Sequence, residues 1–197
     1  IGGLGNDTIG ADDGDNIVLG DEGGITYQAV SGLRDRIESR YLDGAGNSPI
    51  LAAEAVVGDD DITTGGGNDV VIGGLGSGDL AAGDGNNIVL GDEGFVQYQS
   101  GAALLAEISS LYLDNPANGE LDAFVQGGSE VITTGAGDDI VIAGEDGELV
   151  VDAIIAGSTA VARFVTAAAT DGDTVNAGAG HNLVLGDAGD ITASTGT

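Results

Sequence analysis

The chain has 197 residues, a net charge of −29 and only four cationic side chains, all of them arginine. This charge repels nucleic acid and anionic membrane surfaces, so we expect no nucleic-acid partner and no membrane insertion. The 38 glycines and the few aromatic residues (3 Phe, 4 Tyr, no Trp) indicate that burial of large side chains alone does not stabilise the fold. The absence of cysteine excludes disulfides and thiol chemistry.

A nine-residue repeat begins at once with GGLGNDTIG and recurs through most of the chain. Its eighth position always holds a branched aliphatic residue, which favours a short strand whose side chain points into a narrow interior. The preceding glycines supply the positive φ angles of a tight turn. The frames are 2–10, 11–19, 55–63, 64–72, 73–81, 82–90, 125–133, 134–142, 143–151, 168–176 and 177–185, with Ile9, Val18, Ile62, Val71, Leu80, Val89, Ile132, Val141, Val150, Val175 and Val184 at the eighth position.

Strand and turn units of this kind stack about 4.8 Å apart, which predicts an all-β solenoid. The sequence opens in the middle of a motif, so we expect residues 1–197 to form one continuous solenoid segment of a longer protein.

Two insertions, at about 29–54 and 100–124, interrupt the frame and resemble each other. Their matching sequences are SGLRDRIESRYLD at 31–43 and AALLAEISSLYLD at 102–114. Apolar residues at i, i+4 and i+8 (Leu33, Ile37 and Tyr41; Leu104, Ile108 and Tyr112) predict a short helix in each. We expect these helices either to cover an open edge or to mediate lateral self-association with a neighbouring subunit.

A third insertion, at about 152–170, has an apolar pattern that fits either a buried helix or a pair of strands. Repeats and insertions together give a higher-order repeat of about 70–95 residues, since Gly20 and Gly91 start equivalent segments 71 residues apart.

The frame resembles G-G-x-G-x-D-x-U-x, the nonapeptide of the repeats-in-toxin (RTX) family of hemolysin-type calcium-binding repeats. GGLGNDTIG, TGGGNDVVI and TGAGDDIVI carry this resemblance. It implies a parallel β-roll, of the kind found in large secreted and surface bacterial proteins, in which two nonapeptides form each coil. It also implies that Ca²⁺ binds between stacked turns, through sixth-position carboxylates and turn carbonyl oxygens.

The residues themselves also favour calcium. Stacked turns bring acidic side chains close together, and two like charges 4 Å apart repel by about 4 kcal/mol near a protein surface. The frames contain no lysine or arginine to offset this repulsion. Oxygen ligands on flexible glycine-rich turns suit Ca²⁺ better than Mg²⁺ or a transition metal. The predicted sixth-position ligands are Asp7, Asp60, Asp69, Asp139 and Asp173, with Glu130 as a longer variant.

The pattern changes in a phrase that occurs three times, as in GDGNNIVLGDEG at 83–94. The sixth position then holds Asn16, Asn87 or Asn182, which we expect to be neutral hydrogen-bonding residues that end a calcium-type run. The phrase continues with Asp21, Asp92 or Asp187 at a second position, where the family has glycine. These aspartates either cap a calcium column as further ligands or simply start the departing turn.

The sequence contains no H-E-x-x-H motif, no G-x-S-x-G motif and no cysteine–histidine cluster, so we expect no enzymatic activity. The single histidine, His181, occupies the variable fifth position and is predicted to face solvent. We expect a calcium-stabilised spacer, adhesin stalk, surface-layer or fibre component of a secreted or surface-attached bacterial protein. The alternative is an accessory secretion module of an extracellular enzyme whose catalytic domain lies outside this segment.

Overall fold

The structure is a computed structural model that describes residues 1–39, 58–110, 128–144, 160–164, 173–186 and 189–193. These residues form an all-β fold of sixteen strands in three sheets, without a helix. Consequently, this part of the chain holds no helix that could cross a membrane.

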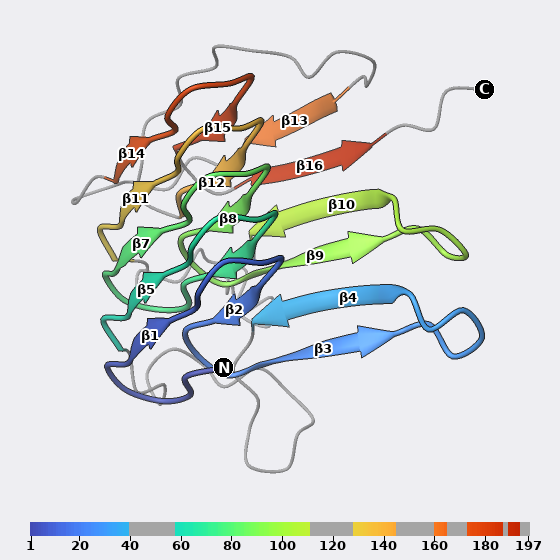
Figure 1. Cartoon of the computed structure of the whole chain (residues 1–197), viewed down its shortest axis with the longest axis horizontal. Helices are drawn as coiled ribbons and strands as arrows, with labels where there is room; N and C mark the ends of the chain where they lie inside the picture. The colour runs from blue at the N-terminus through green and yellow to red at the C-terminus, as the bar shows by residue number, and fades with distance from the viewer. Residues whose placement is uncertain (40–57, 111–127, 145–159, 165–172, 187–188, 194–197) are drawn as a thin grey trace, which may run out of the picture.

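Two of the sheets are parallel and share the same strand order along the chain. Each strand of sheet A is followed in sequence by a strand of sheet B, and we call such a pair a rung. Five rungs lie on top of one another in Figure 1, each hydrogen-bonded to the next in both sheets. Sheet A consists of β1 (Thr8–Gly10), β5 (Asp61–Thr63), β7 (Asp79–Ala81), β11 (Val131–Thr133) and β14 (Thr174–Asn176), and sheet B of β2 (Ile17–Leu19), β6 (Val70–Ile72), β8 (Ile88–Leu90), β12 (Ile140–Ile142) and β15 (Leu183–Leu185).

The eighth residue of the nine-residue frame is the middle residue of every strand in sheets A and B. These side chains form the core between the two sheets, and seven of the ten are buried, with at most 4% of each exposed. The predicted strand positions are therefore confirmed, with Val150 lying outside the described residues. The buried members are Val18, Ile62, Val71, Leu80, Val89, Ile132 and Val141, with Ile9, Val175 and Val184 packed against them.

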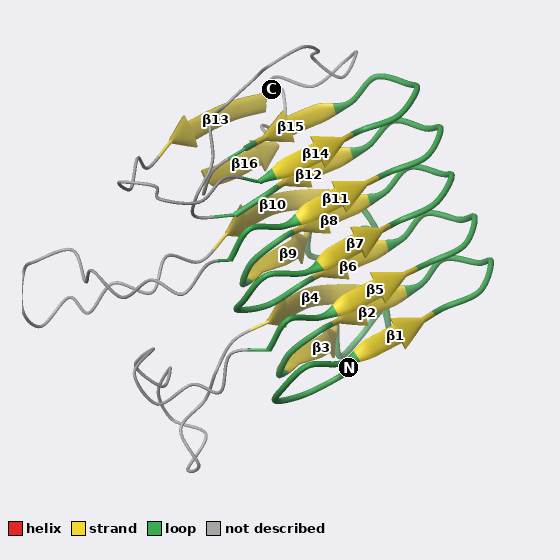
Figure 2. Cartoon of the chain, turned by 90° about the vertical axis from the view of Figure 1, so that its left-hand side faces the viewer, coloured by secondary structure: helices red, strands yellow, loops and turns green. Residues whose placement is uncertain are grey.

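The third sheet, sheet C, is antiparallel and covers the other face of sheet B (Figure 2). Its order is β3 (Gly23–Tyr27), β4 (Arg34–Ser39), β9 (Gly94–Tyr98), β10 (Leu105–Ser110), β16 (Gly189–Ala193) and β13 (Ala160–Phe164), read from the β3 edge. Ile37, Val96 and Ile108 of sheet C are fully buried against Leu19, Leu90 and other side chains of sheet B. Sheet B, covered on both faces, has apolar residues at all three strand positions, as in IVL and VVI, whereas sheet A strands such as DIT do not.

The helices predicted over 31–43 and 102–114 are wrong for the residues that the structure describes. Residues 34–39 and 105–110 form β4 and β10, each paired in an antiparallel hairpin with the strand before it. Ser31-Gly32 and Ser100-Gly101 lie in the hairpin loops, where both glycines have positive φ (68° and 78°). The loops are closed by hydrogen bonds from Gln28 N to Leu33 O and from Gln99 N to Leu104 O, both 2.8 Å.

The hairpins form because a strand sequence precedes each supposed helix. Ile25, Ile37 and Val96 align across adjacent strands and face sheet B together. Burying this alternating face is favourable, whereas an isolated helix would leave sheet B exposed. In the third insertion residues 160–164 form a strand, β13, and the remainder of 152–170 lies outside the described residues.

Candidate metal centre in the stacked turns

Two columns of turns join the sheets, and the sixth position of the frame is the last residue of each turn. A-entry turns lead into the strands of sheet A, and B-entry turns lead into the strands of sheet B. In rung order, the sixth positions of the A-entry turns are Asp7, Asp60, Gly78, Glu130 and Asp173, and those of the B-entry turns are Asn16, Asp69, Asn87, Asp139 and Asn182.

The B-entry sixth positions form a continuous hydrogen-bonded ladder through all five rungs. In each step the backbone N–H of one rung donates to the side-chain Oδ1 of the next. The bonds run from Asn16 to Asp69 (2.8 Å), from Asp69 to Asn87 (3.0 Å), from Asn87 to Asp139 (2.9 Å) and from Asp139 to Asn182 (2.9 Å). Asparagine and aspartate alternate along this ladder, so Asp69 and Asp139 are not on adjacent rungs.

The asparagines also bond within their own turns. Their side-chain amide donates to carbonyl oxygens of the same turn, as an ionised carboxylate could not do. Asn16 Nδ2 donates to Asp12 O and Gly14 O (2.8 Å each), Asn87 Nδ2 to Gly83 O (3.1 Å) and Gly85 O (3.2 Å), and Asn182 Nδ2 to Ala177 O. The predicted hydrogen-bonding role of these asparagines is confirmed, and each precedes the strand after which the chain leaves for sheet C. Asn16 and Asn182 are the two end members of the ladder, whereas Asn87 lies at its centre between Asp69 and Asp139.

Asp69 and Asp139 differ in the surroundings of their second carboxylate oxygen. Asp139 Oδ2 accepts a hydrogen bond from the Thr134 hydroxyl at 2.8 Å. Thr64 and Asp69 occupy the first and sixth positions of their frame, as Thr134 and Asp139 do two rungs later. Asp69 Oδ2 and the Thr64 hydroxyl, however, have no hydrogen-bond partner among the described residues. Both residues are buried, since Asp69 is 0% and Thr64 4% exposed. A buried carboxylate oxygen without a donor is costly unless a proton or a cation lies beside it.

The A-entry column brings acidic residues together in two pairs. Asp60 Oδ1 accepts the backbone N–H of Asp7 (2.8 Å), and Asp173 Oδ1 accepts that of Glu130 (3.1 Å). Asp60 Oδ2 is buried and lacks a hydrogen-bond partner within the described segments. Gly78 separates the pairs because it has no side chain to continue the ladder.

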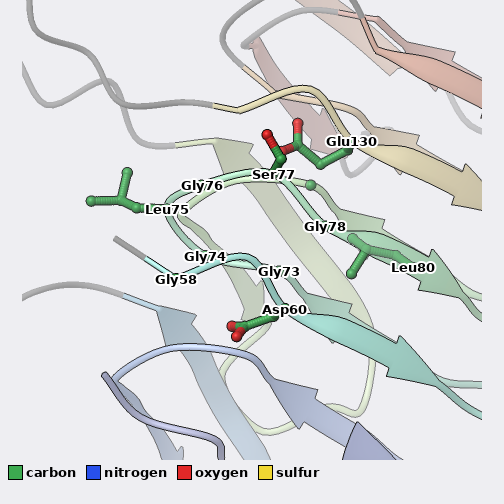
Figure 3. Close-up of a pocket in the computed structure, with 11 residues that line it drawn as sticks. Gly58, Asp60, Gly73, Gly74, Leu75, Gly76, Ser77, Gly78, Leu80 and Glu130 are labelled. Carbon is green, nitrogen blue, oxygen red and sulfur yellow. The ribbon is translucent and has the colours of Figure 1, made fainter. Parts of the chain in front are cut away.

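A narrow pocket marks this interruption. Figure 3 shows Asp60 and Glu130 on either side of the glycine-rich segment 73–78. The remaining lining residues are Gly58, Leu80 and Gly91. Asp60 and Glu130, from the rungs on either side of Gly78, therefore line the same pocket.

Asp21 and Asp92, from the exit phrase, are buried beside the A-entry turns (0% and 2% exposed). Asp21 Oδ2 accepts the N–H of Leu75 at 2.7 Å, and a Cβ on Gly74 or Gly144 would collide with the carboxylate of Asp21 or Asp92, respectively. Both aspartates start the turn that departs for sheet C and also contact a neighbouring rung, and their role as further calcium ligands stays a prediction. Asp187 lies outside the described residues.

The charges of these groups affect one another. Burial, together with the nearby Asp92 and Asp173, raises the pKa of Glu130 from its usual 4.5 to about 11. Burial is the main cause that raises the pKa of Asp60, and the nearby charges of Asp7, Asp59 and Asp61 raise it further. The hydrogen bond from Asp7 N lowers this pKa but does not outweigh them. Without a cation, therefore, the A-entry column holds at least one carboxyl in its protonated form at neutral pH.

Sequence reasoning missed a second ladder, at the fifth position of the B-entry turns. Here the side-chain oxygen of one rung accepts the N–H of the next, in the order Asp15, Asn68, Asn86, Asp138 and His181, with bonds of 2.8–2.9 Å. His181 ends this ladder with an exposed side chain, as predicted, and its N–H and imidazole lower the pKa of Asp138. The other four members of this ladder are all Asp or Asn, whose side chains carry an acceptor oxygen. This recurrence at the fifth position was the signal in the sequence from which the ladder could have been predicted. Glu93, which is 0% exposed, was also missed.

Comparison with known proteins finds no match. No protein family, no curated protein and no solved structure matches this chain. Within the described ranges, no group of three or more histidine, cysteine, aspartate or glutamate side chains is arranged to hold a metal ion. Calcium also accepts carbonyl oxygens and water as ligands, so a site built from one or two carboxylates and turn carbonyls stays a prediction.

Proposed function

We propose that this chain is a calcium-stabilised β-roll segment that serves a structural role in a secreted or surface-attached protein. Its rungs would extend a spacer, stalk, surface layer or fibre, with Ca²⁺ bound between stacked turns. The proposal includes no enzymatic activity for this segment. Lateral association of copies stays a prediction, now through the hairpins of sheet C.

One observation carries the proposal: buried carboxylate oxygens lie in turns that contain no cationic side chain. Asp60 Oδ2 and Asp69 Oδ2 have no hydrogen-bond partner in the described part of the chain, and each residue is at most 3% exposed. The frames contain no lysine or arginine, and the three described arginines lie on β4 and β13 of sheet C. A hard divalent cation is the simplest partner for such oxygens.

Calcium binding would couple folding to export. A ligand that binds only the folded state stabilises it by RT ln(1 + [L]/Kd), about 2.7 kcal/mol per site at one hundred times Kd. Extracellular calcium modules have Kd values of about 10⁻⁴–10⁻³ M. Sites of this strength are empty at cytosolic calcium and filled outside the cell, so the folded state gains stability after secretion.

The test is a calcium titration of chelator-treated protein followed by circular dichroism. We expect the β-sheet signal and Tm to increase with calcium and to saturate. The double variant Asp60→Asn/Asp69→Asn should show a smaller calcium-dependent increase in Tm. The matched control Asp35→Asn/Glu107→Gln, on β4 and β10, should behave like the wild type. If neither the β-sheet signal nor the Tm changes on chelation or on addition of calcium, the proposal is contradicted.

A further inference from the structure

We propose that the side-chain amides of Asn16, Asn87 and Asn182 take the place of bound cations. Their turns then fold without calcium, and the calcium requirement falls on the turns with an acidic sixth position. This inference rests on the proposed function, and concerns which turns depend on the ion.

Asparagine and aspartate share one half of their role in the B-entry ladder. In every step the side-chain Oδ1 accepts the N–H of the rung before, whether the residue is Asp69, Asn87 or Asp139. The two residue types differ only in the second atom of the side chain. This atom is an N–H donor in asparagine and an acceptor oxygen in an ionised aspartate.

The second atom of Asn87 faces carbonyl oxygens. Its Nδ2 donates to Gly83 O and Gly85 O, the second and fourth residues of its turn, and Asn16 Nδ2 makes the equivalent pair of bonds. The corresponding residues in the turn of Asp69 are Gly65 and Gly67. A carboxylate oxygen offers them no hydrogen, so acceptor opposes acceptor unless a cation lies between.

The five B-entry turns thus show three arrangements of the same position. In the three asparagine turns an amide donates to carbonyl oxygens of its own turn, to two of them from Asn16 and Asn87 and to one, Ala177 O, from Asn182. In the turn of Asp139 the Thr134 hydroxyl donates to Oδ2. In the turn of Asp69 the second oxygen is buried and has no hydrogen-bond partner among the described residues, and the Thr64 hydroxyl has none either. The turn of Asp69 is therefore the B-entry turn that most needs a cation.

The two columns also differ in charge. Asparagine separates the acids of the B-entry sixth positions, so no two adjacent rungs are both acidic. The A-entry column contains no asparagine at this position, and Asp7 adjoins Asp60 while Glu130 adjoins Asp173. Adjacent rungs are about 4.8 Å apart, where like charges in partly buried turns repel strongly. The calcium requirement is accordingly greater in the A-entry column.

Exchanging the two residue types in the B-entry ladder tests the inference. Asn87→Asp should add one calcium ion per chain in isothermal titration calorimetry and should lower the Tm of the metal-free protein by about 4 °C or more. Asn86→Asp is the matched control, since it adds the same charge one residue away on an exposed position whose oxygen can still accept the Asp138 N–H. It should change neither quantity.

The reverse exchange keeps the test decisive if Asn87→Asp folds poorly. Asp69→Asn should bind one calcium ion fewer and should raise the metal-free Tm, because the new amide can bond the turn carbonyls. Asp15→Asn is its exposed control. The inference is overturned if Asn87→Asp matches Asn86→Asp in stoichiometry and Tm, if it stays unfolded in calcium, or if Asp69→Asn gains no metal-free stability. A wild-type protein without any calcium response would instead overturn the proposed function.

Discussion

At the scale of single residues, the notable feature is how many carboxylates are buried. Asp21, Asp60, Asp69, Asp92, Glu93, Glu130 and Asp139 are each at most 3% exposed. An isolated charge in such a place costs several kcal/mol, so each must be neutralised by hydrogen bonds, a proton or a cation. Proton and cation compete for the same oxygens, which makes stability depend on pH in a way that calcium should abolish.

Glu130 provides the clearest pH prediction. Its folded-state pKa of about 11 lies above its usual 4.5, so between these values the folded protein binds one more proton than the unfolded chain. Stability is then greatest at acid pH and falls as pH rises through this window. In resin-treated, calcium-free buffer we expect a higher Tm at about pH 5.5 than at about pH 8.

Two variants and one addition check this prediction. Glu130→Gln stays neutral at all pH values, so it should raise the metal-free Tm at about pH 8 and flatten the pH dependence. Glu107→Gln, on β10 in sheet C, should leave the wild-type profile unchanged. Saturating calcium should remove the loss of stability at the higher pH. A metal-free wild-type Tm that increases from pH 5.5 to pH 8 would show that the buried carboxyls are ionised without a metal.

At the scale of elements, the hairpins are part of the core. Ile108 on β10 is 0% exposed and belongs to the cluster that joins sheets B and C. Truncation of such a side chain leaves a cavity and costs about 2–5 kcal/mol. We therefore expect Ile108→Ala to lower the free energy of unfolding by about this amount in urea titrations with calcium present.

Leu104→Ala is the control for this prediction, since it removes the same kind of side chain from the same hairpin at a position that is 61% exposed. Its effect should lie within about 0.5 kcal/mol of zero. If Ile108→Ala were equally harmless, sheet C would be an independent attachment to sheet B instead of a cover for it.

The strands of sheets A and B could be predicted from sequence because one residue decides each of them. The aliphatic eighth position and the glycine turn recur in register, so each of the ten eighth positions that the structure describes was correctly predicted to lie in a strand. The acidic sixth positions likewise lie at the ends of the turns. The seventh and ninth positions of the frame carried a further signal. They are polar in strands of sheet A such as DIT and apolar in strands of sheet B such as IVL, which sheet C covers.

The hairpins could not be assigned from local periodicity alone. The spacing of Leu33, Ile37 and Tyr41 satisfies a helical pattern, yet Ile37 faces sheet B as part of a strand. The deciding partner, Val96, is 59 residues away in sequence and becomes adjacent only when the rungs stack. The alternation of Asp69 with Asn87 likewise depends on how the rungs stack, since it is the stacking that places these two residues next to each other.

At the scale of the whole molecule, the described arginines lie outside the acidic turns. Acidic residues fill the turns, whereas Arg34 and Arg36 lie on sheet C, where Arg36 pairs with Glu38 (2.7 Å) and stacks on Phe95 (3.5 Å to the ring centroid). With a net charge of −29, self-repulsion destabilises the folded state. Any salt should relieve part of this repulsion by screening, so a calcium effect must be distinguished from an ionic-strength effect.

Comparing salts makes this distinction. About 0.5 M NaCl shortens the screening length to a few Å and should raise the metal-free Tm modestly through the exposed charges. About 5 mM CaCl₂ has far lower ionic strength but reaches the buried oxygens of Asp60 and Asp69, so it should raise the Tm more. The same concentration of MgCl₂ should fall short, because Mg²⁺ demands octahedral geometry and keeps its waters. If NaCl or MgCl₂ matched calcium, the acidic turns would act as a diffuse charged surface, and stabilisation would come from screening rather than from bound ions.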